Sequence, residues 1–235
     1  MPKMKSKVFL LTRSVSALAC LACVALGAPL SLPEIMKRLD QNAAGFRAMS
    51  AKLERIDYTA VLRDASKESG EIMLLKKRPG AVAMRIDFTA PDVKQISYSD
   101  KKIQSYLPKI NTVQIVDVGK IDGLISQGIL IGFGTTAKEL QKAYSIKLLG
   151  EEAINGKAAT KLELIPRGDS PLMKLKKIEV WLAVSDGYPL RQKLYQSSGD
   201  YNQATYTDLK INPPITEQSV RLDLPKNVKK DYPSK

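Results

Sequence analysis

Histidine is absent from this 235-residue chain, and its only two cysteines, Cys20 and Cys23, lie near the N-terminus. These absences exclude Ser-His and Cys-His nucleophile systems, and they remove the usual ligands of zinc, copper and haem. The sequence also lacks a G-x-S-x-G nucleophile elbow and an EF-hand loop. We therefore expect a protein that is not an enzyme and that uses no metal and no cofactor.

Residues 1–27 differ in composition from the rest of the chain. A basic start without acidic residues precedes the apolar run SVSALACLACVALGA, which is short for a bilayer span. Ala25 and Gly27 supply small residues for a cleavage site, with Ala28 as the alternative end. The sequence thus predicts a signal peptide over 1–27, a single domain over 28–235, and a periplasmic location.

Both cysteines fall inside this predicted signal, so the mature chain would carry no thiol and no disulfide. A domain of this length folds on its hydrophobic core alone. The competing interpretation is a lipid anchor at Cys20 or Cys23. Neither cysteine has a leucine three residues before it, so the cleaved, unanchored form is favoured.

Positive charge dominates the chain, with a formal net charge of +13. The predicted signal holds four of the 37 basic residues and none of the 24 acidic ones, which leaves an excess of nine. Such an excess favours anionic partners. Export and the lack of an aromatic-interleaved basic patch argue against nucleic acid. A transient contact with a membrane surface, for example through residues 171–177 (PLMKLKK), and a merely solubilising charge remain open.

Most of the chain has the short alternating runs of antiparallel strands. Six such runs lie between residues 51 and 117, and five more follow residue 145. The connections at 155–156 and 186–187 read Asn-Gly and Asp-Gly, which favour type I′ hairpin turns. The pattern predicts a mainly β (α+β) fold, a curved antiparallel sheet or barrel of about eleven strands with helices over its open face.

Two capping boxes predict helices. Ser31 with Glu34 begins a segment with one apolar face, and Thr136 with Glu139 begins a shorter helix that ends near Tyr144. Before the second box, residues 123–137 carry no charge and are rich in glycine and large aliphatic residues. This segment is either a core helix with a glycine-kinked loop or an apolar flap over a cavity.

An ordered set of residues between positions 70 and 108 resembles the LolA-like periplasmic lipoprotein carriers. The likeness consists of a glycine-led strand, Lys-Arg-Pro, an arginine-bearing strand, a proline turn, a Ser-Asp hairpin and a Tyr-x-Pro. The corresponding residues are Gly70, Lys77, Arg78, Pro79, Arg85, Pro91, Ser99, Asp100, Tyr106 and Pro108.

This resemblance implies an unclosed antiparallel β-barrel whose apolar cavity lies under a helical lid. Such a cavity would receive the acyl chains of lipoproteins or other lipids on their way from an inner-membrane donor complex to an outer-membrane acceptor, with the carrier acting as a monomer. In the family, the arginine before the proline holds the lid closed, a role that carries over to Arg78. A guanidinium with five donors suits such a latch.

Apolar residues on the first predicted helix, on two predicted strands and in the uncharged segment are the candidate lining of this cavity. They are Ile35, Leu39, Met73, Leu75, Met84, Ile86, Phe88, Ile129, Leu130 and Phe133.

The chain departs from the carriers in having only four phenylalanines and one tryptophan. From residue 150 to 192 it looks closer to a broader set of outer-membrane lipoprotein-sorting proteins. A second hypothesis is therefore a periplasmic module of the same fold that binds lipids or senses the envelope without delivering lipoproteins. A third is a cationic adaptor whose core is filled.

Overall fold

The computed structural model describes residues 30–78, 81–119, 128–168 and 175–233. The predicted signal peptide, with Cys20 and Cys23, lies outside the described residues. The helices are α1 (Leu32–Gly45), α3 (Ala137–Ala143) and the short 3-10 helix η1 (Pro108–Ile110). The strands are β1 (Ala48–Thr59), β2 (Asp64–Arg78), β3 (Ala81–Ala90), β4 (Lys94–Ser99), β5 (Lys102–Leu107), β6 (Thr112–Asp117), β7 (Tyr144–Ile154), β8 (Lys157–Pro166), β9 (Leu175–Ala183), β10 (Pro189–Gln196), β11 (Tyr201–Ile211) and β12 (Lys229–Asp231).

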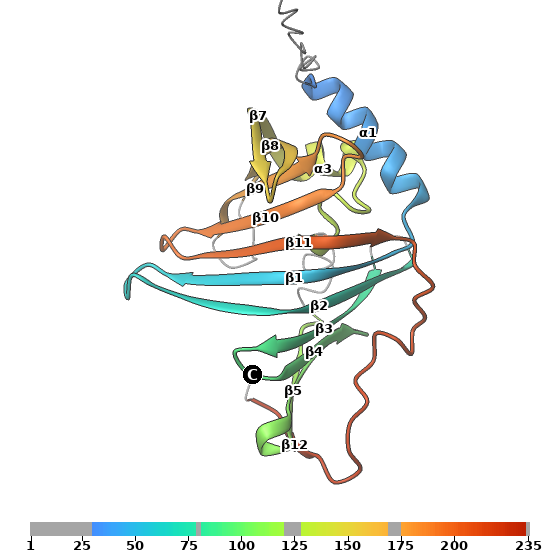
Figure 1. The fold of residues 1–235 in the computed structure, drawn as a ribbon, viewed down its shortest axis with the longest axis vertical. Coiled ribbons are helices and arrows are strands. Elements are labelled where there is room, and N and C mark those ends of the chain that lie inside the picture. Colours follow the sequence, from blue (N-terminus) through green and yellow to red (C-terminus); the bar gives the residue numbers. More distant parts are fainter. Residues whose placement is uncertain (1–29, 79–80, 120–127, 169–174, 234–235) are drawn as a thin grey trace, which may run out of the picture.

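All twelve strands form one curved sheet in the order β12-β6-β5-β4-β3-β2-β1-β11-β10-β9-β8-β7 (Figure 1). Neighbours are antiparallel except β12 and β6, which are parallel. The sheet does not close, because β7 and β12 are its two edges. The predicted mainly β, unclosed antiparallel architecture is confirmed, and each of the eleven predicted strands is present. The twelfth, three charged residues long, gave no strand pattern.

Both predicted helix starts are confirmed. The backbone N–H of Ser31 donates to the Glu34 carboxylate at 2.8 Å ahead of α1. Ahead of α3, the N–H of Thr136 donates to Glu139 at 2.8 Å, and the N–H of Glu139 donates back to the Thr136 hydroxyl at 3.2 Å. These reciprocal bonds satisfy donors that a helix leaves without partners in its first turn.

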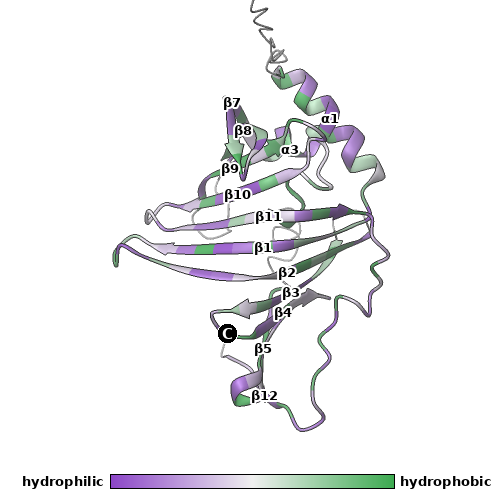
Figure 2. Ribbon diagram, viewed as in Figure 1, coloured by the Kyte–Doolittle hydropathy of each residue, from purple (hydrophilic) through white to green (hydrophobic). Residues whose placement is uncertain are grey.

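Period-2 alternation gives the sheet two different faces. Figure 2 shows apolar and polar residues alternating along the central strands. Met49, Leu74 and Met84 follow one another across β1, β2 and β3, as do Ala51, Ile72 and Ile86. These residues belong to the face that the helices cover, which we call the concave face.

The helices cover the β7 half of the concave face. Buried side chains of α1 and α3 pack on β8, β9 and β10, where Leu164 and Ile178 are almost completely inaccessible. α1 is also tied to the turn between β9 and β10. Arg38 donates to the Val184 carbonyl at 2.5 Å, and Asn42 donates to the Asp186 carbonyl at 2.9 Å. The core on the β3 half of the face therefore depends on another cover, residues 128–134.

Residues 212–228, which connect β11 to β12, run from the end of β11 past the ends of the neighbouring strands (Figure 1) and contact the opposite, convex face. Arg85 of β3 donates to the Arg221 carbonyl at 2.8 Å, and Lys77 of β2 lies 3.6 Å from Glu217. Val220 in this segment is only 1% exposed. This long connection therefore holds the β1–β6 half of the sheet from outside and leaves the concave face free.

Candidate functional site

A cavity of about 560 Å³ lies on the concave face, a volume typical of small-molecule sites. It is bounded by β1, β2, β3, β10 and β11, by the first residue of β9 and by the segment 128–133. Apolar side chains form its floor and walls. They are Met49, Leu53, Ile72, Leu74, Met84, Ile86, Ile129, Phe133, Leu175, Leu194, Ala204 and Tyr206.

One end of this cavity is polar. Arg55, Asp57 and Asn202 line it, close to the β1–β2 turn and the β10–β11 turn. The Arg55 guanidinium lies 2.7 Å from the Asp57 carboxylate, which also accepts a hydrogen bond from Asn202. The Nε atom of Arg55 is buried and has no hydrogen-bond partner among the described residues. The cavity therefore has an apolar interior and a polar, hydrogen-bonding end, an arrangement suited to an amphiphile.

The candidate lining residues divide into three groups. Met84, Ile86, Ile129 and Phe133 do line the cavity. Phe88 and Leu130 are buried in the core around it, at 1% and 5% exposure. Ile35 and Leu39 lie on α1 and pack in the separate core against β8 and β9, outside the cavity.

Met73 and Leu75 lie on the other face of β2, contrary to expectation. Met73 lies opposite Arg85 and helps to line a shallow hollow on the convex face, whereas its neighbours Ile72 and Leu74 line the cavity. The sequence IMLL is apolar at both parities, so alternation alone does not say which pair points inward. The neighbouring strand β3 alternates cleanly, and its pairing with β2 would have identified the inward pair.

The segment 128–134 is held down by a buried hydrogen-bond chain. The Tyr206 hydroxyl donates to the Gln192 side chain at 2.8 Å, and Gln192 donates to the Ile131 carbonyl at 2.7 Å. Burial raises the pKa of Tyr206, so this hydroxyl stays protonated and available as a donor. Phe133 packs its ring edge-to-face on Tyr206, with centroids 5.5 Å apart. The described part of the predicted flap is therefore a packed cover with one side on the cavity.

Gly132 allows this cover to turn back on itself. Its φ of +78° lies in the left-handed region, and a Cβ atom there would approach Pro189 to 2.6 Å. A side chain at this position would be both strained and obstructed. The rest of the predicted uncharged segment, residues 123–127, lies outside the described residues.

The cationic run before Pro79 fastens the end of β2. The Lys76 ammonium donates to the Ala43 carbonyl in α1 at 3.4 Å, and Lys77 lies 3.0 Å from Asp100. The side chain of Arg78, predicted to latch the lid, and Pro79 lie outside the described residues. Lys76 thus makes the kind of contact with a helix carbonyl that the resemblance assigned to Arg78.

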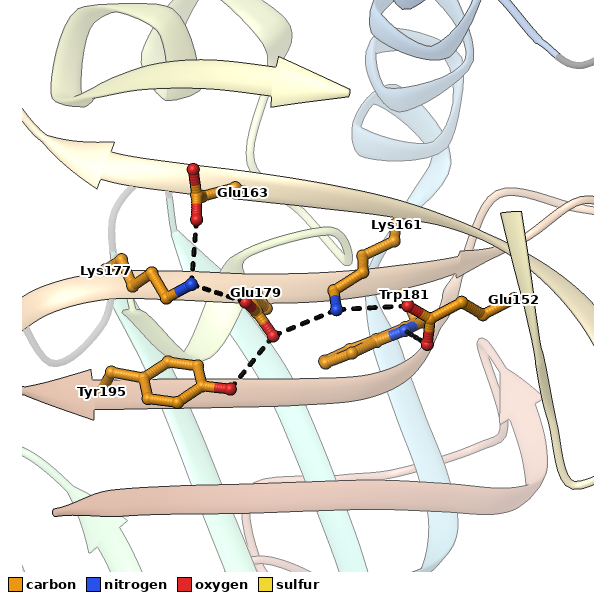
Figure 3. Close-up of polar contacts among 7 residues, drawn as sticks. All are labelled: Glu152, Lys161, Glu163, Lys177, Glu179, Trp181 and Tyr195. Carbon is orange, nitrogen blue, oxygen red and sulfur yellow. Dashed lines mark hydrogen bonds and ion pairs between the residues drawn. The ribbon is translucent and has the colours of Figure 1, made fainter. Parts of the chain in front are cut away.

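The convex face carries a second polar cluster, around Glu179 of β9 (Figure 3). Glu179 lies 2.7 Å from Lys177 and 3.4 Å from Lys161, and it accepts a hydrogen bond from Tyr195 at 3.1 Å. Burial alone would raise the pKa of Glu179. The hydrogen bond from Lys177 and the two ammonium charges outweigh burial and hold that pKa below its usual value.

This cluster extends to its neighbours. Lys177 also lies 2.9 Å from Glu163, and its hydrogen bonds to the two carboxylates raise its pKa. Trp181 donates to Glu152 at 2.9 Å, with the Lys161 ammonium 4.7 Å from its ring centroid. Each carboxylate here has a cationic or hydrogen-bonding partner, so the cluster joins β7 to β10 on the outer face.

The described residues contain no group of three or more His, Cys, Asp or Glu side chains arranged to hold a metal ion. Within the same residues, no helix is long and apolar enough to cross a membrane.

Residues 81–224, more than half of the chain, match the family model described as the MucB/RseB N-terminal domain. No curated protein sequence matches the chain. Among solved structures, an uncharacterized conserved protein from Thermus thermophilus is 16% identical over 87% of this chain and 100% of its own, with a TM-score of 0.51. At this identity the likeness concerns the fold alone.

Two further structures have lower TM-scores. A putative outer membrane lipoprotein-sorting protein domain from Vibrio parahaemolyticus is 17% identical over 80% of this chain and 94% of its own, with a TM-score of 0.43. The Pseudomonas aeruginosa MucA/MucB complex contains a chain that is 18% identical over 80% of this chain and 59% of its own, with a TM-score of 0.44.

The hydrogen-bond chain predicts the effect of removing one hydroxyl. Tyr206→Phe leaves the buried acceptor of Gln192 without its donor, which costs about 1–3 kcal/mol. We expect amide hydrogen exchange in residues 129–134 to accelerate roughly tenfold. Tyr144→Phe is the matched control, because the Tyr144 hydroxyl has no hydrogen bond to the described residues. Equal exchange in the two variants would contradict the tether.

The convex cluster predicts a dependence of stability on pH. Because the folded pKa of Glu179 lies below its reference value of 4.5, its contribution to stability is present above that pH and is lost as the pH falls through the folded value. Glu179→Gln should therefore lower the free energy of unfolding at neutral pH, and the difference from wild type should shrink in acid. Urea titrations of both proteins, from neutral pH to below pH 4.5, measure this difference in the free energy of unfolding.

Glu151→Gln serves as control, since Glu151 is exposed and makes no ion pair with the described residues. A difference between wild type and Glu179→Gln that stays constant down to low pH would show that the effect is not one of charge.

Proposed function

The chain belongs to the MucB/RseB N-terminal domain family, and we propose that it is a periplasmic protein whose concave cavity binds the acyl chains of a lipoprotein or another amphiphile. Proteins of this family are generally non-catalytic binding proteins. The observation that carries the proposal is the cavity itself, with its apolar interior and its polar end at Arg55 and Asp57. An amphiphile would place its chain along the floor and its head group at the polar end.

The energetics suit a reversible carrier. Each CH₂ group removed from water contributes about 0.8 kcal/mol, so a chain that enters a dry cavity is held firmly without a covalent bond. A volume of about 560 Å³ is limited, and part of the wall is the separate segment 128–134. Movement of that cover would enlarge the site for entry and release at a modest cost in hydrogen bonds.

Delivery of lipoproteins from the inner to the outer membrane is the finer part of the proposal. It is supported by the resemblance of residues 70–108 to the lipoprotein carriers and by the expected export through the signal peptide 1–27. The protein would then act as a monomer between an inner-membrane donor complex and an outer-membrane acceptor. Arg78, at the end of β2, is the proposed latch between the sheet and its cover.

A second candidate function is a lipid-binding or envelope-sensing module that acts on a partner protein. The family match favours it, because MucB has been solved in complex with MucA. In this case ligand in the cavity would change the affinity for the partner, and no lipoprotein would be delivered.

Filling the cavity should abolish binding. We expect the wild-type protein, purified from a bacterial periplasm, to bind a triacylated lipopeptide stoichiometrically by native mass spectrometry, and its deacylated form not at all. Met84→Trp places an indole in the cavity and should weaken binding at least about tenfold, because the acyl chain loses buried apolar area.

Met73→Trp is the matched control. It makes the same change on the adjacent strand, but on the convex face, and should leave binding unchanged. The proposal fails if the wild type shows no acyl-dependent binding, or if both tryptophan variants bind as well as the wild type.

A further inference from the structure

The strand order brings four hairpin connections to one rim of the sheet. Because neighbouring strands are antiparallel, the connections β1–β2, β3–β4, β5–β6 and β10–β11 all emerge at the same end. We call residues 60–63, 91–93, 108–111 and 197–200 the turn rim. The β9–β10 turn, which anchors α1, lies at the other end, whereas the convex connection runs from that end to the rim, where Asn111 donates to the Asn227 carbonyl.

Exposed apolar side chains gather at this rim. Eight large hydrophobic residues are exposed among the described residues, and four of them occupy its turns: Val61 at 87%, Leu62 at 71%, Ile110 at 60% and Val93 at 52%. Ile165, at 46%, ends β8 on the same side. A single exposed apolar residue needs no explanation, but a set at the tips of one rim does.

The β1–β2 turn reaches furthest. β2 pairs with β1 from Asp64 onward, whereas its pairing with β3 begins only at Ser69, so the hairpin extends beyond its neighbour. Figure 1 shows this turn projecting past the rest of the sheet. It is braced, since the Arg63 N–H donates to the Ala60 carbonyl at 3.2 Å and the Ala60 N–H donates to Asp200 at 2.7 Å. Val61 and Leu62 are thus presented on an ordered support.

Basic side chains accompany these apolar tips. Arg63 follows Leu62, is exposed, and makes no ion pair with the described residues. Lys176, at the start of β9, is exposed on the same side. The turn rim itself holds Arg63 and Lys109 against Asp92 and Asp200, so its local charge is balanced, and its apolar tips are the part suited to the boundary between head groups and acyl chains of a membrane. The net positive charge of the chain supports the same approach.

The cavity ends at this rim. Thr59, Gln196 and Asp200 line its polar end and adjoin the β1–β2 and β10–β11 turns. We propose that the turn rim docks on an anionic lipid bilayer, with Val61 and Leu62 entering the interface, so that the polar end of the cavity faces the membrane. This inference rests on the proposed function, since a cavity mouth at a membrane is useful only if acyl chains pass through it.

A bilayer fits better than a protein partner. The apolar residues stand on separate turns with polar residues between them, whereas a stable protein interface needs roughly 800 Å² of continuous complementary surface on each side. A fluid interface accepts isolated tips without matching their shape. A protein partner at the rim is the alternative that the test excludes.

Vesicle flotation tests the docking directly. We expect the wild-type protein to float with lipopeptide-free vesicles of phosphatidylethanolamine and phosphatidylglycerol, and to bind less at high salt. The double variant Val61→Ser/Leu62→Ser should bind at least about tenfold more weakly. The control Val116→Ser/Leu149→Ser removes two apolar residues that are each 40% exposed away from the rim, and it should float like wild type.

Lipopeptide binding in vesicle-free solution, measured on the same variants, separates the two proposals and verifies folding. A rim variant that binds lipopeptide but not vesicles supports docking. If the wild type floats with vesicles but neither it nor any variant binds lipopeptide, the proposed function is wrong and membrane docking alone is supported. Failure of the wild type to float, or equal flotation of the rim and control variants, would overturn the docking proposal and favour a protein partner.

Discussion

The curvature of one large antiparallel sheet with an apolar concave face is the constraint on which the structure depends. Such a face must be covered, and α1 and α3 cover only the part over β8, β9 and β10. Among the described residues, the cover over β1, β2, β3 and β11 is the short segment 128–134, and a cavity of about 560 Å³ lies beneath it. The cavity thus lies between the sheet and this separate cover.

The two faces of the sheet differ in how they are packed. The convex face carries the ion cluster around Glu179 and the connection from β11 to β12, so the strands are held together from outside. The concave face can then keep an unfilled volume without loss of the fold. Gln192 connects the sheet to the cover, since it lies on β10 and its side chain donates a hydrogen bond to the Ile131 carbonyl. Two buried hydrogen bonds, from Tyr206 to Gln192 and from Gln192 to the Ile131 carbonyl, fasten the cover to the sheet.

Local signals in the sequence predicted local structure well. The likeness to the LolA-like superfamily and the architecture are confirmed. The Asn-Gly hairpin has the expected positive φ at Asn155 and Gly156, 49° and 77°, whereas at Asp186-Gly187 only the glycine has a positive φ, so the type I′ prediction is wrong there. What failed was information that depends on distant pairing. Which residues of β2 point to the concave face follows from its register with β3. Strand β12 is a strand only because it pairs with β6. The hydrogen bond that holds the cover joins Gln192 to Ile131, 61 residues away. None of these contacts leaves a pattern in its own segment.

Photo-crosslinking tests the central claim most directly. A triacylated lipopeptide that carries a photoreactive group at the end of one acyl chain would be bound to the wild-type protein and irradiated, and the modified residues would be mapped by mass spectrometry. The account predicts crosslinks to the cavity floor, at Met49, Leu74 or Phe133. Crosslinks confined to the convex face, at Met73 or its neighbours, would contradict it.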